Sequence, residues 1–278
     1  MDLRNSLWPG FLRGPLRRDA ERGTIDMPAY FARHVFVHTH IPKTGGSSFV
    51  MGLRKILGPE HVCDLRAQSP SPHEMSGEEV DRIWALSGHF WFDTQERPIR
   101  RRKHHFLSIR DPVDRFISLY NFVREAKGHP GHDKYGILDI EDAFDYLKQH
   151  MPNAISNTIC SMFGPRSSKL LRRGEPGLVR RFDLKVTFEE ALPKIERHYA
   201  LVIPTKRVDD ALRGIADAFG VGPLHVERHN VGARKVTELS DRVRSELLAL
   251  NREDSRLLEH FEPLFDQRLR NLPARLLR

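Results

Sequence analysis

The sequence contains little cysteine and no long apolar run. Among its 278 residues there are 2 cysteines, Cys63 and Cys160, which lie far apart and lack the spacing of metal ligands. This disfavours a disulfide-stabilised scaffold and favours a reducing compartment. No stretch reaches the roughly 20 consecutive apolar residues that a bilayer-spanning helix needs. We therefore expect no transmembrane segment.

The N-terminal region also lacks the uninterrupted apolar core of a secretory signal. Charged residues and prolines interrupt it, namely Arg4, Pro9, Arg13, Pro15, Arg17 and Arg18. We expect a cytoplasmic protein in which residues 1–30 form a mobile arm, residues 31–270 form one folded domain, and residues 271–278 form a tail.

The overall composition is that of a globular protein with a basic excess. Hydrophobic residues make up 39% and charged residues 29%, and the length suits one sizeable α/β domain. Lys plus Arg number 45 against 37 for Asp plus Glu, giving a formal net charge of +8. This excess favours a polyanionic ligand such as a nucleotide, an acidic glycan or a nucleic acid. General solubility in an Arg-rich proteome explains it equally well.

Strands alternate with helices along the chain. Short β-branched or apolar runs predict strands at Val35–Ile41, Gly88–Phe92, His104–Ile109 and Ala200–Pro204. Helical spacing and capping residues predict helices at Ser47–Leu57, around Glu78–Leu86, from Pro112, at Ile140–Gln149 and Pro152–Phe163, from Thr187 to near His198, and at Val208–Phe219. This order predicts one P-loop-like α/β domain whose central parallel sheet is flanked by helices. Ligands of such folds bind at the carboxyl ends of the strands.

A further apolar pattern at helical spacing runs from Val243 to Leu264. It is short and broken at Asp254 and Pro263, so core packing explains it better than a coiled-coil dimer seam.

The first motif with chemical meaning follows the first predicted strand and opens a helix. Residues Ile41–Ser48 read IPKTGGSS. Consecutive glycines allow a tight turn in which several backbone N–H groups converge, and the helix N-terminus adds its positive dipole end. Lys43 adds a full positive charge. The sequence therefore predicts a phosphate-binding loop, but the lysine precedes the glycines, so the Walker A order is absent.

The second motif follows the strand His104–Ile109. Residues Ser108–Tyr120 read SIRDPVDRFISLY. Arg110 leaves the strand at its carboxyl end, and Ser118 lies two turns into the next helix on a face that can look back at Arg110. A guanidinium and a hydroxyl can together hold a second phosphate. Taken alone, the motif is equally consistent with a surface Arg–Asp pair and a helix cap.

Together the two motifs resemble the PAPS-dependent sulfotransferases, especially the carbohydrate branch that includes heparan sulfate and uronyl 2-O-sulfotransferases. PAPS is 3′-phosphoadenosine 5′-phosphosulfate, and the resemblance extends from about His34 to Arg268. It implies that one set of residues contacts the 5′-phosphosulfate, namely Lys43, Thr44, Gly45, Gly46, Ser47 and Ser48. It implies that Arg110 and Ser118 hold the 3′-phosphate.

Two weaker likenesses extend the resemblance. Gly88-His89-Phe90 matches a Gly-His segment whose histidine acts as the catalytic base in the 2-O-sulfotransferase branch. Residues 229–235, which read HNVGARK, occupy the position of a basic loop over the nucleotide, so Arg234 and Lys235 become candidate donor contacts. Eukaryotic relatives carry an N-terminal membrane anchor, whereas we expect none here, so the expected protein is a bacterial cytoplasmic enzyme whose acceptor stays open.

The resemblance implies in-line sulfuryl transfer to a hydroxyl, with a carbohydrate or glycolipid as the expected acceptor. An acceptor hydroxyl needs a base, for which His89 is suited, while Lys43 and the glycine amides stabilise the leaving phosphate oxygen. Residues 127–135 and 153–163 are expected to border the acceptor. The other histidines, including His38, His40, His104 and His105, are interpreted as structural. No metal is predicted, because no cluster of carboxylates or cysteines completes a site with His129 and His132.

Two other functions stay open at this level. A nucleotide-dependent phosphoryl transferase could use the same loop, but it needs Mg²⁺, and no convincing acidic strand end is present to hold one. A non-catalytic protein could bind nucleic acid or an acidic glycan through the basic run Arg100–Lys103. The resemblance favours the enzyme without nucleic acid as a partner, and the oligomeric state is not readable.

Overall fold

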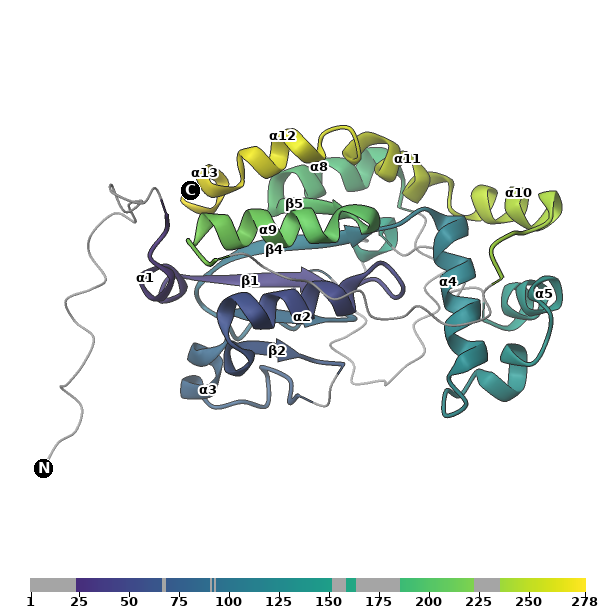
Figure 1. The fold of residues 1–278 in the computed structure, drawn as a ribbon, viewed down its shortest axis with the longest axis horizontal. Coiled ribbons are helices and arrows are strands. Elements are labelled where there is room, and N and C mark those ends of the chain that lie inside the picture. The colour runs from purple at the N-terminus through teal and green to yellow at the C-terminus, as the bar shows by residue number, and fades with distance from the viewer. Residues whose placement is uncertain are drawn as a thin grey trace, which may run out of the picture.

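A parallel five-stranded sheet forms the centre of the molecule (Figure 1). The computed structural model describes residues 24–66, 69–90, 92, 94–151, 159–163, 186–222 and 236–278. Its strands are β1 (His34–Thr39), β2 (Val62–Asp64), β3 (Ala85–Gly88), β4 (Arg102–Ile109) and β5 (Tyr199–Pro204). Their order is β2-β3-β1-β4-β5, and every neighbouring pair is parallel. The predicted α/β fold class is confirmed.

Helices cover the sheet because side chains alternate between its two faces. Phe106, Leu201 and Ile203 pack toward α2 (Gly46–Leu57) and α9 (Val208–Ala218), whereas Leu107 and Val202 pack toward α8 (Phe188–His198) and α11 (Arg252–Phe261). The helices of the described residues are α1 (Met27–Phe31), α2 (Gly46–Leu57), α3 (Gly77–Arg82), α4 (Pro112–Glu125), α5 (Ile140–His150), α8 (Phe188–His198), α9 (Val208–Ala218), α10 (Asp241–Leu250), α11 (Arg252–Phe261), α12 (Phe265–Arg270) and α13 (Leu272–Leu276). Among them, none is long and apolar enough to cross a membrane.

Both ends of the described chain pack onto the core, unlike the arm and tail that the sequence predicts. Tyr30 and Phe31 of α1 are fully buried, and the Ile25 N–H donates to the Ala218 carbonyl at 2.8 Å. Leu272 and Leu276 of α13 are buried in the same cluster. Residues 24–30 and 271–278 thus belong to the folded unit, because each supplies apolar side chains to the α2 and α9 face.

Two predicted elements around residues 78–92 were wrong in extent, and one strand was missed. Helix α3 ends at Arg82, and the next residues form β3, which ends at Gly88 where the sequence predicted a strand to begin. Ala85 and Leu86 pair with β1 on one side and β2 on the other. These pairings outweigh the local helical spacing. Strand β2 has only three residues, too few for a periodic pattern.

Asp254, which interrupts the C-terminal apolar pattern, is a buried anchor. Its carboxylate accepts hydrogen bonds from the backbone N–H groups of Cys160, at 3.0 Å, and Ile159, at 3.3 Å. Burial raises the pKa of Asp254, while these hydrogen bonds and the buried Arg115 act in the opposite direction. Core packing of this segment is confirmed for Val243, Leu247, Leu257 and Phe261, which are buried, whereas Leu250 is exposed.

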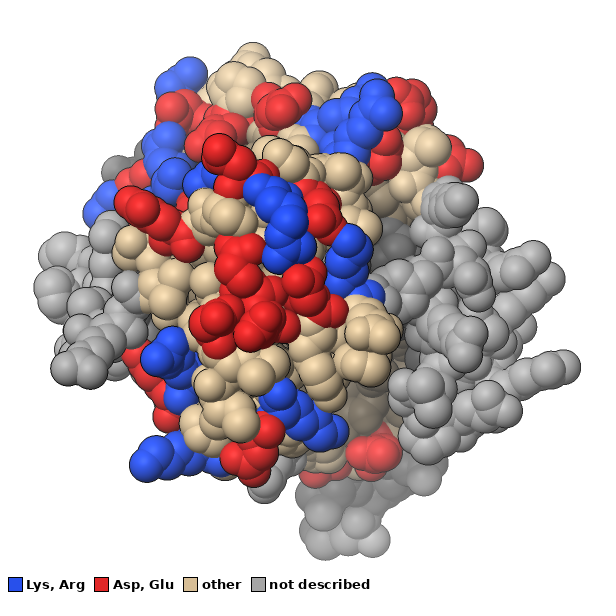
Figure 2. Space-filling view, turned by 90° about the vertical axis from the view of Figure 1, so that its right-hand side faces the viewer, with Lys and Arg blue, Asp and Glu red and all other residues tan. Residues whose placement is uncertain are grey.

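The end of the molecule that carries α5 and α10 has mixed charge. Figure 2 shows acidic side chains grouped there with basic side chains beside them. Arg242 of α10 forms ion pairs with Glu141 and Asp145 of α5 at 3.0 and 2.9 Å. In the described part of this face, the basic excess of the chain therefore forms no continuous positive surface.

Candidate active site

The loop after β1 is folded back on itself at the carboxyl edge of the sheet. Lys43 and Gly45 both have a positive φ, 69° and 82°. The buried Thr44 closes the turn, since its hydroxyl donates to the Ile41 carbonyl at 2.8 Å and its N–H reaches the same oxygen at 3.3 Å. A backbone with left-handed residues on both sides of Thr44 can point successive N–H groups at one anion.

The two glycines are required for different reasons. A β-carbon on Gly46 would lie 2.1 Å from Cδ2 of His40, so any side chain there collides with the ring packed against it. Gly45 is the N-cap of α2 in the left-handed region that L side chains rarely adopt. Helix α2 therefore starts within the loop, and its first N–H groups lack helical partners and can receive an anion.

Arg110 joins the second motif to the first. Its Nη1 donates to the backbone carbonyl of Lys43 at 3.2 Å. Asp111 caps α4 by accepting the Asp114 N–H at 2.9 Å, as the sequence predicts, and Thr205 after β5 donates to the Ile109 carbonyl at 2.9 Å. Burial lowers the pKa of Arg110, and the carboxylates of Asp114 and Asp111 oppose this. Arginine stays charged under such a shift.

The other residues that the sequence predicts to bind the nucleotide differ in where the structure places them. The ammonium of Lys43 lies over the Phe122 ring of α4, 4.0 Å from its centroid. Ser118 is half-buried on the same helix. Ser47 and Ser48 lie in the first turn of α2. Arg234 and Lys235 lie outside the described residues, so their role stays a prediction.

His89 follows β3 and is exposed beside the loop. Its Nδ1 donates to the His40 carbonyl at 2.6 Å, and the two rings are 4.5 Å apart. A neutral imidazole carries one N–H, and this bond uses it. Nε2 is then the ring nitrogen with a lone pair, which is the state that a general base requires.

His38 and His40 are buried beneath the site, in agreement with the structural interpretation. His38 hydrogen-bonds Ser87 through Nδ1 and Ser108 through Nε2, both at 2.9 Å. Burial lowers the pKa of His38 to about 3 and lowers that of His40 as well. Both rings are neutral at physiological pH and support the strand ends on which the site is built.

Sequence reasoning missed Arg66, which contacts the first turn of α2 from the end of β2. Its Nη1 donates to the Ser47 hydroxyl at 2.8 Å, while Nε and Nη2 donate to the two carboxylate oxygens of Asp64 at 2.9 and 2.8 Å. Burial by itself would raise the pKa of Asp64, but the hydrogen bonds from Arg66 hold it below its ordinary value. The pattern Asp-Leu-Arg after a three-residue strand gave no periodic signal to find it by.

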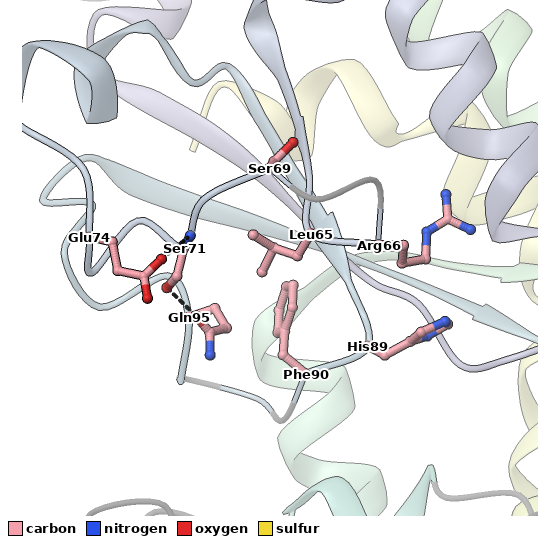
Figure 3. Close-up of a pocket in the computed structure, with 8 residues that line it drawn as sticks. All are labelled: Leu65, Arg66, Ser69, Ser71, Glu74, His89, Phe90 and Gln95. Atoms are coloured by element: carbon pink, nitrogen blue, oxygen red, sulfur yellow. Dashed lines mark hydrogen bonds between the residues drawn. The ribbon is translucent and has the colours of Figure 1, made fainter. Parts of the chain in front are cut away.

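An open pocket of about 560 Å³ lies next to Arg66 and His89 (Figure 3). Figure 3 shows Arg66 and His89 at one side, Leu65 and Phe90 in the middle, and polar side chains at the other side. The polar residues at that side are Ser71, Glu74 and Gln95, and Ser69 lies above Leu65. The pocket thus begins where the donor loop and the candidate base meet.

The two histidines of the loop before α5 form hydrogen bonds with backbone groups of the chain. His132 Nδ1 hydrogen-bonds the Val123 carbonyl at 3.1 Å, and His129 Nδ1 accepts the Gly131 N–H at 3.0 Å. Within the described ranges, no group of three or more His, Cys, Asp or Glu side chains is placed to hold a metal ion.

Comparison with known proteins bears on the segment that contains both motifs. Residues 29–157 match a family model described as "Sulfotransferase family", and this stretch includes the loop, His89, Arg110 and Ser118. The chain carries a sulfotransferase-family segment. The match supports an enzyme that transfers a sulfuryl group as the general reaction. No curated protein matches the chain significantly. The match leaves the acceptor undefined.

Proposed function

We propose that this sulfotransferase takes its sulfuryl group from PAPS and transfers it to a hydroxyl acceptor, a carbohydrate or glycolipid. The observation that carries the proposal is the contact between Arg110 and the Lys43 carbonyl, which brings two anion-binding motifs together at one edge of the sheet. A nucleotide with phosphates at both its 5′ and 3′ positions needs two such sites side by side.

The roles follow from the position of each group. The left-handed turn at Lys43 and Gly45 and the start of α2 suit the 5′-phosphosulfate. The contact set proposed for it is Lys43, Thr44, Gly45, Gly46, Ser47 and Ser48. Arg110, assisted by Ser118 of α4, is proposed to hold the 3′-phosphate, because a guanidinium binds phosphate oxygens in pairs. Arg234 and Lys235 are proposed to add positive charge over the nucleotide.

The proposed reaction is an in-line displacement at sulfur. The acceptor oxygen forms a new S–O bond, its proton passes to Nε2 of His89, and the S–O bond to the 5′-phosphate breaks. The electron pair of that bond stays on the phosphate oxygen of the product PAP, 3′-phosphoadenosine 5′-phosphate. Lys43 and the N–H groups of the loop stabilise the charge that develops on this oxygen. No metal enters the proposed step.

The alternative of a nucleic-acid-binding protein depends on the basic run Arg100–Lys103, and part of this run is used within the fold. Arg101, in the middle of the basic run, donates hydrogen bonds to the carbonyls of Phe31, Val80 and Ile83 at 2.7–2.8 Å. Its guanidinium ties α1 and α3 to the sheet edge. The basic run therefore has in part a structural role. For the phosphoryl-transfer alternative, no contact in the described residues favours it.

The test of the donor is a calorimetric titration with PAP, ADP and ATP in the absence of added metal. We expect PAP to bind at least about tenfold more tightly than ADP, because one charge-assisted contact to the 3′-phosphate provides a difference of that order. Equal affinity for PAP and ADP would remove the basis for PAPS as donor. Strict dependence of activity on ATP and Mg²⁺ would favour the phosphoryl transferase.

Arg110→Ala is expected to weaken PAP binding by about 10–100-fold and to change ADP binding little, since the variant loses a charged hydrogen-bond donor to the 3′-phosphate alone. The measurement is the same titration. The matched control is Arg197→Ala, an exposed arginine on α8, which should bind both nucleotides normally. Equal losses for PAP and ADP in Arg110→Ala would contradict a role specific to the 3′-phosphate.

A further inference from the structure

The pocket in Figure 3 is linked to the proposed donor loop by two short connections. At one, Arg66 lines the pocket and donates to the Ser47 hydroxyl of α2 at 2.8 Å. At the other, His89 lines the pocket and donates to the carbonyl of His40, whose ring packs against Gly46. A group bound at the end of the pocket formed by Arg66 and His89 would lie beside both the proposed base and the loop.

The walls of the pocket are tied together by hydrogen bonds between two segments of chain. The Ser71 hydroxyl donates to Oε1 of Gln95 at 2.7 Å, and Nε2 of His73 bonds the Thr94 carbonyl at 2.9 Å. The loop after β2 is thereby joined to the segment after β3. These hydrogen bonds hold the two segments that line the pocket in place relative to each other.

The lining combines an apolar middle with hydrogen-bonding groups at its far side. Leu65 and Phe90 offer a surface for the C–H face of a ring, while Ser69, Ser71 and Gln95 offer hydroxyl and amide groups. Small-molecule sites commonly have this composition, in which apolar contact gives affinity and a few polar groups fix orientation. A pyranose ring presents the complementary surface, with C–H faces and hydroxyls at its edge.

The charges of the lining disfavour an anionic acceptor. The guanidinium of Arg66 is already paired with both carboxylate oxygens of Asp64. Glu74 places a carboxylate at the opposite side, where its Oε2 accepts the Ser71 N–H at 3.1 Å. A second carboxylate in the pocket would face Glu74, and like charges placed together weaken binding strongly. A hydroxyl would instead donate a hydrogen bond to Glu74.

We propose that this pocket is the acceptor site and that it selects an uncharged, hydroxyl-rich group such as a neutral pyranose over a uronate. The inference rests on the proposed function, since it takes His89 as the base and the loop as the donor site. Glu74 is the residue that sets this selectivity. It acts on the acceptor and not on the donor.

The test compares methyl β-glucopyranoside with methyl β-glucopyranosiduronate, which differ at C6 by a hydroxymethyl group against a carboxylate. Transfer of labelled sulfate from PAPS is measured for each sugar. We expect kcat/KM for the neutral sugar to exceed that for the uronate by about tenfold or more, as for a like-charge contact. Glu74→Gln should reduce this ratio several-fold, because the amide keeps an acceptor for the Ser71 N–H and removes the charge.

The control variant is Glu78→Gln in the first turn of α3, which makes the same change outside the pocket and should leave the ratio unchanged. The affinity for PAP should be the same in both variants and in the wild type. A wild-type preference for the uronate, an unchanged ratio in Glu74→Gln, or no transfer to either sugar by protein that binds PAP would overturn the pocket assignment. Failure to bind PAP would instead overturn the proposed function.

Discussion

Replacement of His89 by alanine is expected to lower the turnover number of sulfuryl transfer by about 10²–10⁴-fold, the usual contribution of a general base. The affinity for PAP should stay nearly unchanged. The reason is local: His89 donates Nδ1–H to the His40 carbonyl at 2.6 Å, which leaves Nε2 to take the acceptor proton. In the proposed function, donor affinity comes from the loop and Arg110, which the substitution leaves in place.

A second variant separates the loss of the base from any structural effect of removing the His89 side chain. The amide of His89→Gln can still donate to the His40 carbonyl, but it cannot accept a proton, so this variant should be as slow as alanine. The acidic limb of the pH–rate profile should disappear in both variants. His150→Ala, an exposed histidine at the end of α5, is the matched control and should retain full turnover. Parallel loss of PAP binding and turnover in His89→Ala would contradict the assignment of a base.

Moderate acid is expected to destabilise the fold strongly, with a large loss already between pH 7 and pH 5. Burial lowers the pKa of His38, His104 and His105 to about 3. In the unfolded chain these imidazoles have a pKa of about 6.5. Below that value the unfolded state binds protons that the folded state excludes, so the free energy of unfolding falls as pH falls toward the folded pKa.

The magnitude is large because several histidines act together. Each histidine whose pKa falls from about 6.5 to about 3 removes roughly 2 kcal/mol of stability at pH 5 relative to pH 7.5. The three together remove about 6 kcal/mol, comparable to the whole stability of a typical domain. His34 and His40, whose pKa values are also lowered, act in the same direction. Asp254 acts in the opposite direction, since its pKa is raised.

Denaturant unfolding at pH 7.5 and pH 5 measures this loss directly. His104 supplies a matched variant, since its Nε2 is buried without a hydrogen-bond partner and its ring packs against Tyr30. His104→Phe should reduce the difference in unfolding free energy between the two pH values by roughly 2 kcal/mol, because one titrating group is removed. Equal stability of the wild type at both pH values would show that these histidines are accessible to protons in the folded state.

The elements with a strong local signal were predictable from the sequence. Strand β1 and helix α2 were expected almost at their observed bounds, because a β-branched run, a glycine turn and an amphipathic run follow one another. The capping box at Thr187 and the Asp111-Pro112 start of α4 were also confirmed. Each of these signals depends on residues within a few positions of one another. The sequence of a short segment is therefore enough to predict the element that it forms.

Signals that depend on distant partners were missed or misread. Ala85 and Leu86 have helical spacing with α3, yet they form β3, because strands β1 and β2 lie on both sides to pair with them. Asp254 breaks an apolar pattern as a surface residue would, yet it is buried because the N–H groups of residues 159 and 160, far along the chain, require an acceptor.

The sequence alone determined the fold class, the glycine turn that opens α2 and the sulfotransferase resemblance, because glycine conformation, helix initiation and the residues of the two motifs are local properties. The tertiary structure decided which side chains share the site. Only parallel pairing of the strands brings Arg110 to the carbonyl of Lys43 and Arg66 to Ser47. The pocket that joins Glu74 to His89 depends on contacts between segments after different strands, which no local pattern records.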